Sequence, residues 1–483
     1  MRFLGPLAAC LVLASCTATT EPDPPAPSSE TTRAPTPEPP DEPAPEPVVE
    51  EPLVLAVHAT RSVSDVPVAA ARRMLARGAR SWTAIGQEGE AMRVVSGGLP
   101  TGVAPGATAL DHASIALDRV RTSSDAVAVV PASEVDATVR VLTVGGVHPL
   151  RSPDDYPVQV ATGGEPGTVV TMTVVGDIML GRGVGDVLDE AGDPAAALRP
   201  LAERLASADI TVGNLESTLS DNGSPTQGTD SFAADPAVRR GLRLAGFDAL
   251  SLANNHLGDF GPVALDETLD LLRDGRFEWF GGGRNLDRAR RPLVIEIDGV
   301  STGFYGTESI GETPAATATT GGTNRLNMPP RTGPLDRATL RRMAKDLRRL
   351  ATQVDTVVVV PHWGTQYTHV PEPIQRRVAR VFARAGADLV LGGHPHWVQG
   401  WEQMDDTTVV HSLGNFVFDM DFSTQTMEGV FVEIVTWDGE LKAVEPMPYL
   451  MDDDFTPRLA PGPSGQSVLD DMWSTSTGPY VVP

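Results

Sequence analysis

The amino-acid sequence predicts a protein of the α/β class, in which short apolar strands alternate with amphipathic helices. Runs of strand length, such as residues 169–175 and 356–360, consist mainly of valine, which is typical of strands buried within a sheet. Between such runs, apolar residues recur every three or four positions, as in Leu340, Met343, Leu347 and Leu350. With 41% hydrophobic and 21% charged residues, most of the 483-residue chain is expected to be globular.

The charge of the chain limits which partners are expected, and its cysteine content limits which residues can bind a metal. The chain has 38 basic and 63 acidic residues and a net charge of −25, so its surface repels phosphate backbones and nucleic acid is not expected as a partner. Its two cysteines, Cys10 and Cys16, lie close to the N-terminus. A metal site elsewhere in the chain must therefore use His, Asp, Glu or Asn.

The N-terminal residues resemble an export signal. A short apolar run follows Arg2 and ends in Leu13-Ala14-Ser15-Cys16, which resembles a bacterial lipobox. The resemblance implies a signal peptide over residues 1–16 and a lipidated Cys16 that anchors the protein at the extracytoplasmic face of the cell membrane; an ordinary signal peptide is the alternative. Residues 17–52 are rich in proline and acidic residues, so we expect a disordered spacer.

A first folded region is predicted over residues 53–160. Strand-like and helix-like segments alternate there, which indicates a small α/β domain. This alternation of strands and helices resembles one lobe of a periplasmic solute-binding protein, and a packing or spacer domain is the alternative. His58, His112 and His148 lack the spacing of metal ligands and are expected to be structural.

A glycine-rich break at residues 162–167 precedes a second, larger α/β region, predicted over residues 168–450 and followed by a C-terminal extension, 451–483. Five of its apolar strands end in side chains that bind metals, and the carboxyl ends of parallel strands gather at one edge of a sheet. These side chains belong to Asp177, Glu216, Asn255, His362, His394 and His396. Such a mixed set of nitrogen and oxygen ligands suits divalent Zn, Mn or Fe.

The pair His394 and His396 is the most specific part of this pattern. Alternate residues of an extended segment face the same way, so both imidazoles are expected on one side. The preceding Gly392-Gly393 lets the backbone approach a ligand closely. A lone Asp177 after a strand is more often a turn or cap residue, so the metal prediction depends on all five strand ends together.

Six motifs occur in order over residues 170–420: GDIMLGR, NLEST, NNHLGDFG, HWGTQY, GADLVLGGHPHWVQG and HSLGNFVFD. Together they resemble the CapA family of capsule and poly-γ-glutamate synthesis proteins, which is similar to the calcineurin-like metallophosphoesterases. The resemblance implies a four-layer sandwich of two β-sheets flanked by helices. It also implies an envelope protein that supports synthesis, export or anchoring of an anionic capsular polymer.

The phosphoesterase pattern implies a role for each strand-end residue. Asp177 matches the first aspartate, Glu216 the carboxylate shared between two metals, and Asn255 the amide ligand. His256 is the expected proton donor. His362 and His394 would complete one metal site, and His396 would contribute to the other.

Two departures from that pattern leave catalysis open. Met179 stands where the phosphoesterases carry a histidine, and Glu216 replaces the usual bridging aspartate. His411 is a candidate for the missing imidazole, with packing as its alternative role. The chain is therefore expected to be a CapA-type accessory protein, with the anionic polymer or its membrane synthase as partner. There are two alternatives. One is an exported phosphoesterase that acts on an envelope or nucleotide phosphate ester, and the other is a non-catalytic polymer-binding scaffold.

Three tryptophans flank the motifs: Trp363, Trp397 and Trp401. They are expected either to stack on a ligand or to pack beneath the site.

Overall fold

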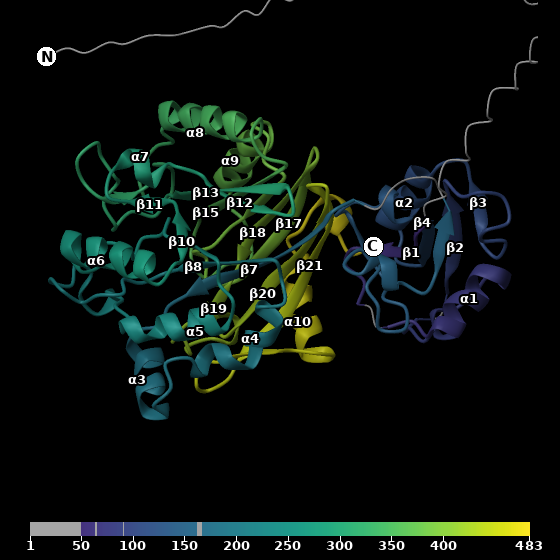
Figure 1. Cartoon of the computed structure of the whole chain (residues 1–483), viewed down its shortest axis with the longest axis horizontal. Coiled ribbons are helices and arrows are strands. Elements are labelled where there is room, and N and C mark those ends of the chain that lie inside the picture. The colour runs from purple at the N-terminus through teal and green to yellow at the C-terminus, as the bar shows by residue number, and fades with distance from the viewer. Residues whose placement is uncertain (1–49, 63–64, 90, 162–166) are drawn as a thin grey trace, which may run out of the picture. The chain divides into compact units, whose positions relative to one another are not determined.

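The computed structural model describes residues 50–483, with gaps at 63–64, 90 and 162–166 (Figure 1). Cys16, the predicted signal peptide, residues 17–49 of the predicted spacer and most of the glycine-rich break lie outside the described residues. Within the described ranges, no helix combines the length and apolar character needed to cross a bilayer.

The first region, up to residue 161, contains one sheet with a helix on each face. Its strands are β1 (Glu50–His58), β2 (Arg93–Gly97), β3 (Thr108–Leu110), β4 (Ala126–Pro131), β5 (Val139–Val141) and β6 (Gln159–Ala161). The order is β3-β2-β4-β1-β5, and β6 pairs with the start of β1. Strand β1 begins at Glu50, inside the segment assigned to the spacer.

Helices α1 (Val68–Arg77) and α2 (Ala113–Arg121) cover opposite faces of this sheet. Alternate residues of β1 face opposite ways, so Leu55 packs with the α1 side and Ala56 with the α2 side. His58 is buried and its Nδ1 lies 2.8 Å from Thr60 Oγ1. His148 Nδ1 accepts the N–H groups of residues 150 and 151, and His112 is exposed before α2, so the described contacts of these histidines are structural.

The larger region contains two sheets. The first has the order β10-β9-β8-β7-β20-β21-β22, with β19 also pairing with β7. Its strands are β7 (Val169–Ile178), β8 (Ile210–Leu215), β9 (Ala249–Ser251), β10 (Glu278–Phe280), β19 (Asn415–Val417), β20 (Glu428–Trp437), β21 (Glu440–Met451) and β22 (Pro457–Leu459). Strands β7 to β10 are parallel, and β20 to β22 are antiparallel.

The second sheet has the order β12-β13-β15-β16-β18-β17. Its strands are β12 (Leu293–Ile297), β13 (Val300–Glu308), β15 (Thr356–His362), β16 (Leu389–Leu391), β17 (Val398–Met404) and β18 (Thr407–Leu413). The four central strands, β13, β15, β16 and β18, are parallel. A separate two-stranded ladder joins β11 (Gly282–Gly283) to β14 (Gly322–Thr323).

Apolar side chains fill the space between the two large sheets, among them Val174 and Val212 of the first and Val358 and Leu391 of the second. Four helices pack on the outer face of the first sheet: α3 (Arg182–Ala191), α4 (Arg199–Leu205), α5 (Arg239–Leu244) and α6 (Gly261–Asp274). Helices α8 (Arg337–Leu350) and α9 (Pro373–Ala383) pack on the outer face of the second (Figure 1). The four-layer sandwich is therefore confirmed.

Two further α-helices pack elsewhere on the sheets. Helix α7 (Leu286–Ala289) contacts the β11–β14 ladder, and α10 (Pro463–Trp473) contacts strands β17, β20 and β21. The ring of Trp473 on α10 lies edge-on to Trp401 of β17, with centroids 5.3 Å apart. The segment predicted as a C-terminal extension thus packs on both large sheets.

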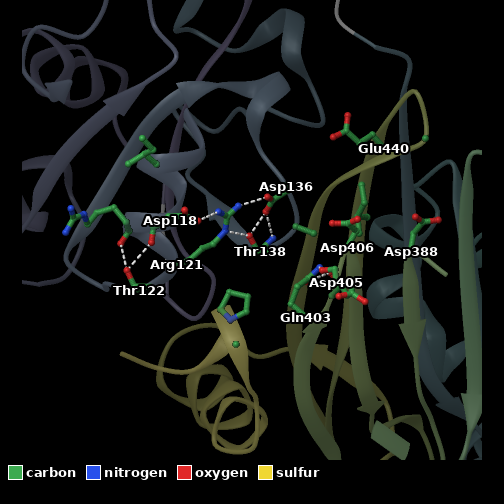
Figure 2. A pocket seen from close by; sticks show the side chains of 18 of the residues that line it. Asp118, Arg121, Thr122, Asp136, Thr138, Asp388, Gln403, Asp405, Asp406 and Glu440 are labelled. Atoms are coloured by element: carbon green, nitrogen blue, oxygen red, sulfur yellow. Dashed lines mark hydrogen bonds and ion pairs between the residues drawn. The ribbon is translucent and has the colours of Figure 1, made fainter. Parts of the chain in front are cut away.

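A cavity of about 1280 Å³ opens beside the antiparallel strands (Figure 2). Asp136 and Arg121 line one side of it, and Asp405 and Asp406 line another. Its lining includes none of the strand-end residues that the sequence singles out. The chemistry expected from the sequence therefore lies elsewhere.

The packing of α8 on the second sheet makes a stability prediction. Leu347 is fully buried in that layer, whereas Lys345, two residues away, is exposed. Leu347→Ala should lower the free energy of unfolding by roughly 2–5 kcal/mol, because it removes buried apolar contacts and leaves a cavity. Lys345→Ala should change it by less than about 0.5 kcal/mol. Equal effects of the two substitutions in chemical denaturation would contradict this packing.

Candidate metal centre

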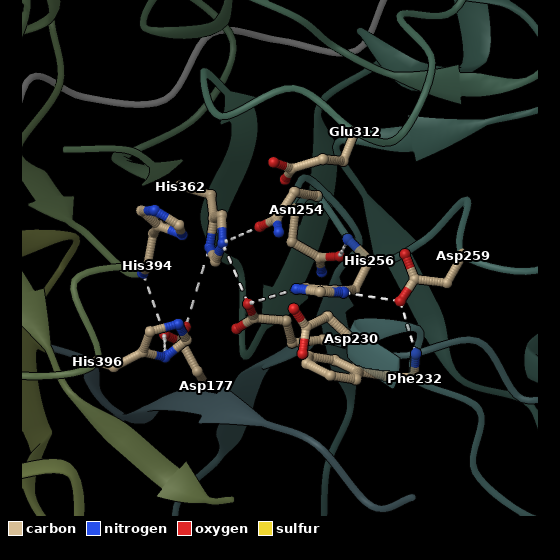
Figure 3. Close-up of polar contacts among 12 residues, drawn as sticks. Asp177, Asp230, Phe232, Asn254, His256, Asp259, Glu312, His362, His394 and His396 are labelled. Carbon is tan, nitrogen blue, oxygen red and sulfur yellow. Dashed lines mark hydrogen bonds and ion pairs between the residues drawn. The ribbon is translucent and has the colours of Figure 1, made fainter. Parts of the chain in front are cut away.

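The strand ends singled out by the sequence converge at one edge of the sandwich (Figure 3). Asp177 lies near the end of β7 and His362 ends β15. The remaining side chains lie on the segments that follow β8, β9 and β16. They belong to Glu216, Asn255, His256, His394 and His396, and all of these residues are buried.

Two overlapping sets of side chains have the spacing of metal ligands. The ligand atoms of Glu216, His394 and His396 lie within 4.8 Å of one another, as do those of Asp177, Glu216 and His362. Glu216 is common to both sets, which is the position that the family resemblance assigns to it. The histidines group differently from the pairing that the resemblance implies, because His394 lies with His396 and not with His362. Asn255 lies next to the second set, with its Oδ1 2.9 Å from His362 Nε2.

Several of these buried atoms lack a hydrogen-bond partner in the described chain. They are Nδ1 and Nε2 of His394 and Oε1 of Glu216. Leaving a buried polar group unpaired is costly, so native structures rarely do so without a reason. An imidazole nitrogen beside a carboxylate oxygen is a donor pair that divalent metals accept. The residues present therefore fit a metal ion.

Burial shifts the protonation of the whole cluster. Desolvation, followed by the charge of Glu216, raises the pKa of Asp177 to about 7, and burial raises the pKa of Glu216 well above its usual range. Desolvation lowers the pKa of His396 to about 3, and it also lowers the pKa values of His362 and His394. Neutral imidazole is the form that ligates metals. Two ionised carboxylates at this depth call for a compensating positive charge.

Asp177 is held by a loop with unusual backbone geometry. The backbone N–H of His394 donates to Asp177 Oδ2 at 3.0 Å, and a Cβ atom on Gly393 would lie 2.5 Å from Asp177 Oδ1. His394 and His396 have positive φ angles of 93° and 58°. The expected extended segment is therefore a strained turn instead, although both imidazoles still reach one ligand set, with ring centroids 5.6 Å apart.

Asn214 is a member of the cluster that sequence reasoning missed. Its Nδ2 donates to Asp177 Oδ1 at 2.8 Å and lies 3.4 Å from Glu216 Oε2, while its Oδ1 accepts from Asn254 Nδ2 at 2.9 Å. One amide therefore joins the ends of β7 and β8 to the segment after β9. Its position two residues before Glu216, on the same side of the strand, was the available signal.

His256 is fixed in orientation by a second set of contacts (Figure 3). Its Nδ1 lies 2.7 Å from Asp259 Oδ2, and that carboxylate also accepts the backbone N–H of Phe232 at 2.6 Å. The Phe232 ring stacks on the imidazole with centroids 3.8 Å apart. These contacts leave Nε2 on the cluster side, 3.9 Å from Glu216 Oε1.

Met179 and His411 do not join the candidate ligands. Met179 is buried in the core under α3 to α6, and its Sδ accepts the N–H of Gly181 at 3.2 Å. His411 Nε2 lies 3.4 Å from Glu402 Oε1, and its ring stacks with Trp363. Neither ligand set includes His411, so its possible role as the missing imidazole is not supported, and packing is the role its contacts show.

The three tryptophans also pack rather than line the cluster. Trp363 and Trp401 are each 1% exposed, and Trp363 Nε1 donates to the backbone oxygen of His411 at 3.0 Å. Trp397 is half-buried beside His369, with ring centroids 4.9 Å apart. Of the two roles expected for these tryptophans, the contacts support packing and not stacking on a ligand.

A family model described as "Bacterial capsule synthesis protein PGA_cap" matches residues 171–420, which include every candidate ligand. The chain belongs to this family. It is similar to the capsule biosynthesis protein CapA of Bacillus anthracis, with 30% identity over 269 residues that cover 55% of this chain and 63% of the relative. The family resemblance drawn from the motifs is thus confirmed.

A second CapA-family relative is the PGA biosynthesis protein CapA of Bacillus subtilis (strain 168), which is 30% identical over 270 residues, 55% of this chain and 67% of the relative. The match spans about two thirds of the length of each relative. Among solved structures, the chain is similar to the NAD nucleotidase NadN of Haemophilus influenzae, with 11% identity, a TM-score of 0.34 and coverage of 65% and 57% of the two chains.

The unpaired imidazole of His394 generates a metal-binding prediction. Wild-type protein should bind about one divalent ion tightly, with a second at higher free metal, because both ligand sets need Glu216 and the charge of a first ion repels a second. His394→Ala should abolish the tight site, since loss of a ligand costs more than the ~10–100-fold of an outer-shell change. Titration calorimetry and elemental analysis measure both.

His112→Ala is the matched control for this experiment, because His112 is exposed and lies outside both ligand sets. It should bind metal as the wild type does. Full metal retention by His394→Ala would rule out the assignment.

Proposed function

We propose that this CapA-family protein supports synthesis, export or attachment of an anionic capsular polymer, and that its strand-end cluster is a metal-dependent hydrolytic site for a phosphate-linked or amide-linked envelope substrate. The observation that carries the proposal is the buried cluster around the unpaired His394, within a segment whose relatives are named for capsule and PGA biosynthesis.

The cluster offers ligands for two neighbouring divalent ions. Glu216, His394 and His396 would hold one ion, and Asp177, Glu216 and His362 would hold the other with help from Asn255. Zn, Mn or Fe suits this mixture of imidazole and oxygen ligands. A bound ion of this kind polarises a phosphoryl or acyl oxygen and lowers the pKa of water.

His256 is the group that moves a proton in this proposal. Its Nε2 lies on the cluster side, and burial lowers the pKa of the ring to about 3, so the imidazole is neutral near pH 7. A proton taken up at Nε2 from the attacking water is returned to the leaving group, which is the proton-donor role that the family resemblance implies for His256. Asp259, at Nδ1, holds the ring in position and stabilises the imidazolium that forms.

Membrane attachment is a separate part of the proposal, and it rests on Cys16 and the residues before it. Two acyl chains on Cys16 would anchor the protein stably at the outer face of the membrane. Cys16→Ala should then move the protein from the membrane fraction to the soluble fraction and abolish labelling by a fatty-acid probe. Unchanged detergent partitioning would exclude a lipid anchor.

The function is tested by deleting the gene and measuring surface polymer. The deletion strain should lose polymer, the wild-type gene should restore it, and genes encoding His394→Ala or His256→Ala should not. Restoration by both variants would show a non-catalytic scaffold. Unchanged polymer in the deletion strain, combined with turnover of a phosphodiester by the purified protein, would support the exported phosphoesterase instead.

The contact between His256 and Asp259 yields a sharper kinetic prediction. Asp259→Asn should keep the metal but lower turnover by ~10²-fold or more, because the amide neither orients the ring equally nor stabilises its protonated form. Asp274→Asn, a similar change at an exposed residue of α6, should leave turnover unchanged. Unaltered turnover in Asp259→Asn, with the fold intact by thermal melting, would remove His256 from the mechanism.

A further inference from the structure

Helices α8 and α9 concentrate positive charge on a chain whose net charge is −25. Together they hold nine basic residues and a single acidic one, Asp346, which pairs with Arg290 outside these helices. On an acidic protein, a local basic surface attracts polyanions, while the rest of the surface repels them.

The arginines on the facing sides of the two helices are unpaired. Arg337, Arg341 and Arg348 follow one another along one side of α8 at helical spacing, and Arg377 lies on α9. All four are exposed, and among the described residues none of them forms an ion pair or a side-chain hydrogen bond. By contrast, Arg182 forms an ion pair with Asp419. Their hydrogen-bond donors are therefore free for a ligand.

These arginines border a groove of about 440 Å³ between the helices. Apolar side chains of Leu340, Ala344 and Val381 also line it. A ligand that matches this surface has regularly spaced anionic groups joined by an aliphatic backbone. Guanidinium groups bind carboxylates in a two-pronged geometry, which lysine does not offer.

We propose that the groove between α8 and α9 binds an extended polycarboxylate chain, with carboxylates on Arg337, Arg341, Arg348 and Arg377 and methylene groups on the apolar floor. The proposal rests on the proposed function only for the identity of the polymer, poly-γ-glutamate. The groove itself uses none of the candidate metal ligands.

The groove begins at the edge of the sheet where the metal centre lies. Strands β13, β15 and β16 are parallel, so α8 and α9, which connect them, run back antiparallel to the strands. The first turns of both helices therefore lie at the edge that carries His362 and His394.

A membrane surface is the competing occupant, and the apolar residues of the helices disfavour it. Helices that lie on membranes present large apolar side chains to the lipid. Here Leu347 and Phe382 are fully buried, and neither helix exposes a large hydrophobic side chain. The exposed surface offers charge without an apolar face to insert.

The test measures binding of fluorescent poly-γ-glutamate to the full-length protein by anisotropy, at low and at raised salt. Replacing Arg337, Arg341, Arg348 and Arg377 together by Gln should weaken binding at least 10-fold and reduce its salt dependence, because ion pairs are screened by salt. The matched control replaces four exposed arginines of the first region, Arg73, Arg77, Arg80 and Arg119, by Gln and should stay within about twofold of the wild type.

Three outcomes would overturn the proposal. They are no polymer binding by the wild type, equal weakening by both quadruple variants, and arginine-dependent binding to phosphatidylglycerol vesicles without binding to polymer. The His394→Ala variant separates this proposal from the proposed function, because it should lose the metal yet keep polymer binding. Polymer binding that survives in His394→Ala but is lost in the groove variant supports the groove even if no hydrolysis is found.

Discussion

The burial of two carboxylates, Asp177 and Glu216, at the edge where two sheets meet is the constraint on which the site depends. Neither has measurable exposure, and burial disfavours their ionised forms. The surrounding chain offsets this cost with the N–H of His394 and the amide of Asn214. The absence of a side chain at Gly393 permits the close approach. The backbone strain at His394 accompanies the hydrogen bond that its N–H donates to this carboxylate.

The packing of the sandwich holds the two carboxylates rigidly in place. Apolar strands close the space between the sheets, so the strand ends cannot move independently of one another. His256 lies on the segment after β9 and is held by Asp259 and Phe232, rather than by the candidate ligands. The candidate ligands and the proposed proton-transfer group are therefore positioned by separate contacts, so one can be altered without the other.

Charge is distributed unevenly, and this unevenness supports the proposed binding of a polymer. A net charge of −25 repels an anionic chain from most of the surface. The arginines of α8 and α9 provide one basic track, which starts at the edge that carries the metal centre. An acidic protein can in this way handle an anionic polymer, provided that contact is confined to one groove. The groove and the candidate metal centre share no residues, so the two proposed activities can be tested independently.

The sequence alone determined the α/β class, the strand ends that carry the candidate ligands, and the family, because apolar runs and metal-binding side chains are local signals. It did not determine the turn at His394 and His396, the role of Asn214, or the packing of Met179 and His411 away from the ligands. Asp177 and His394 are 217 residues apart, and their hydrogen bond exists only because β7 and β16 end at the same edge. Likewise, a basic helix is visible in the sequence, but a groove needs two helices side by side. Contacts between distant segments are decided by packing of the sheets, and only the tertiary structure contains that information.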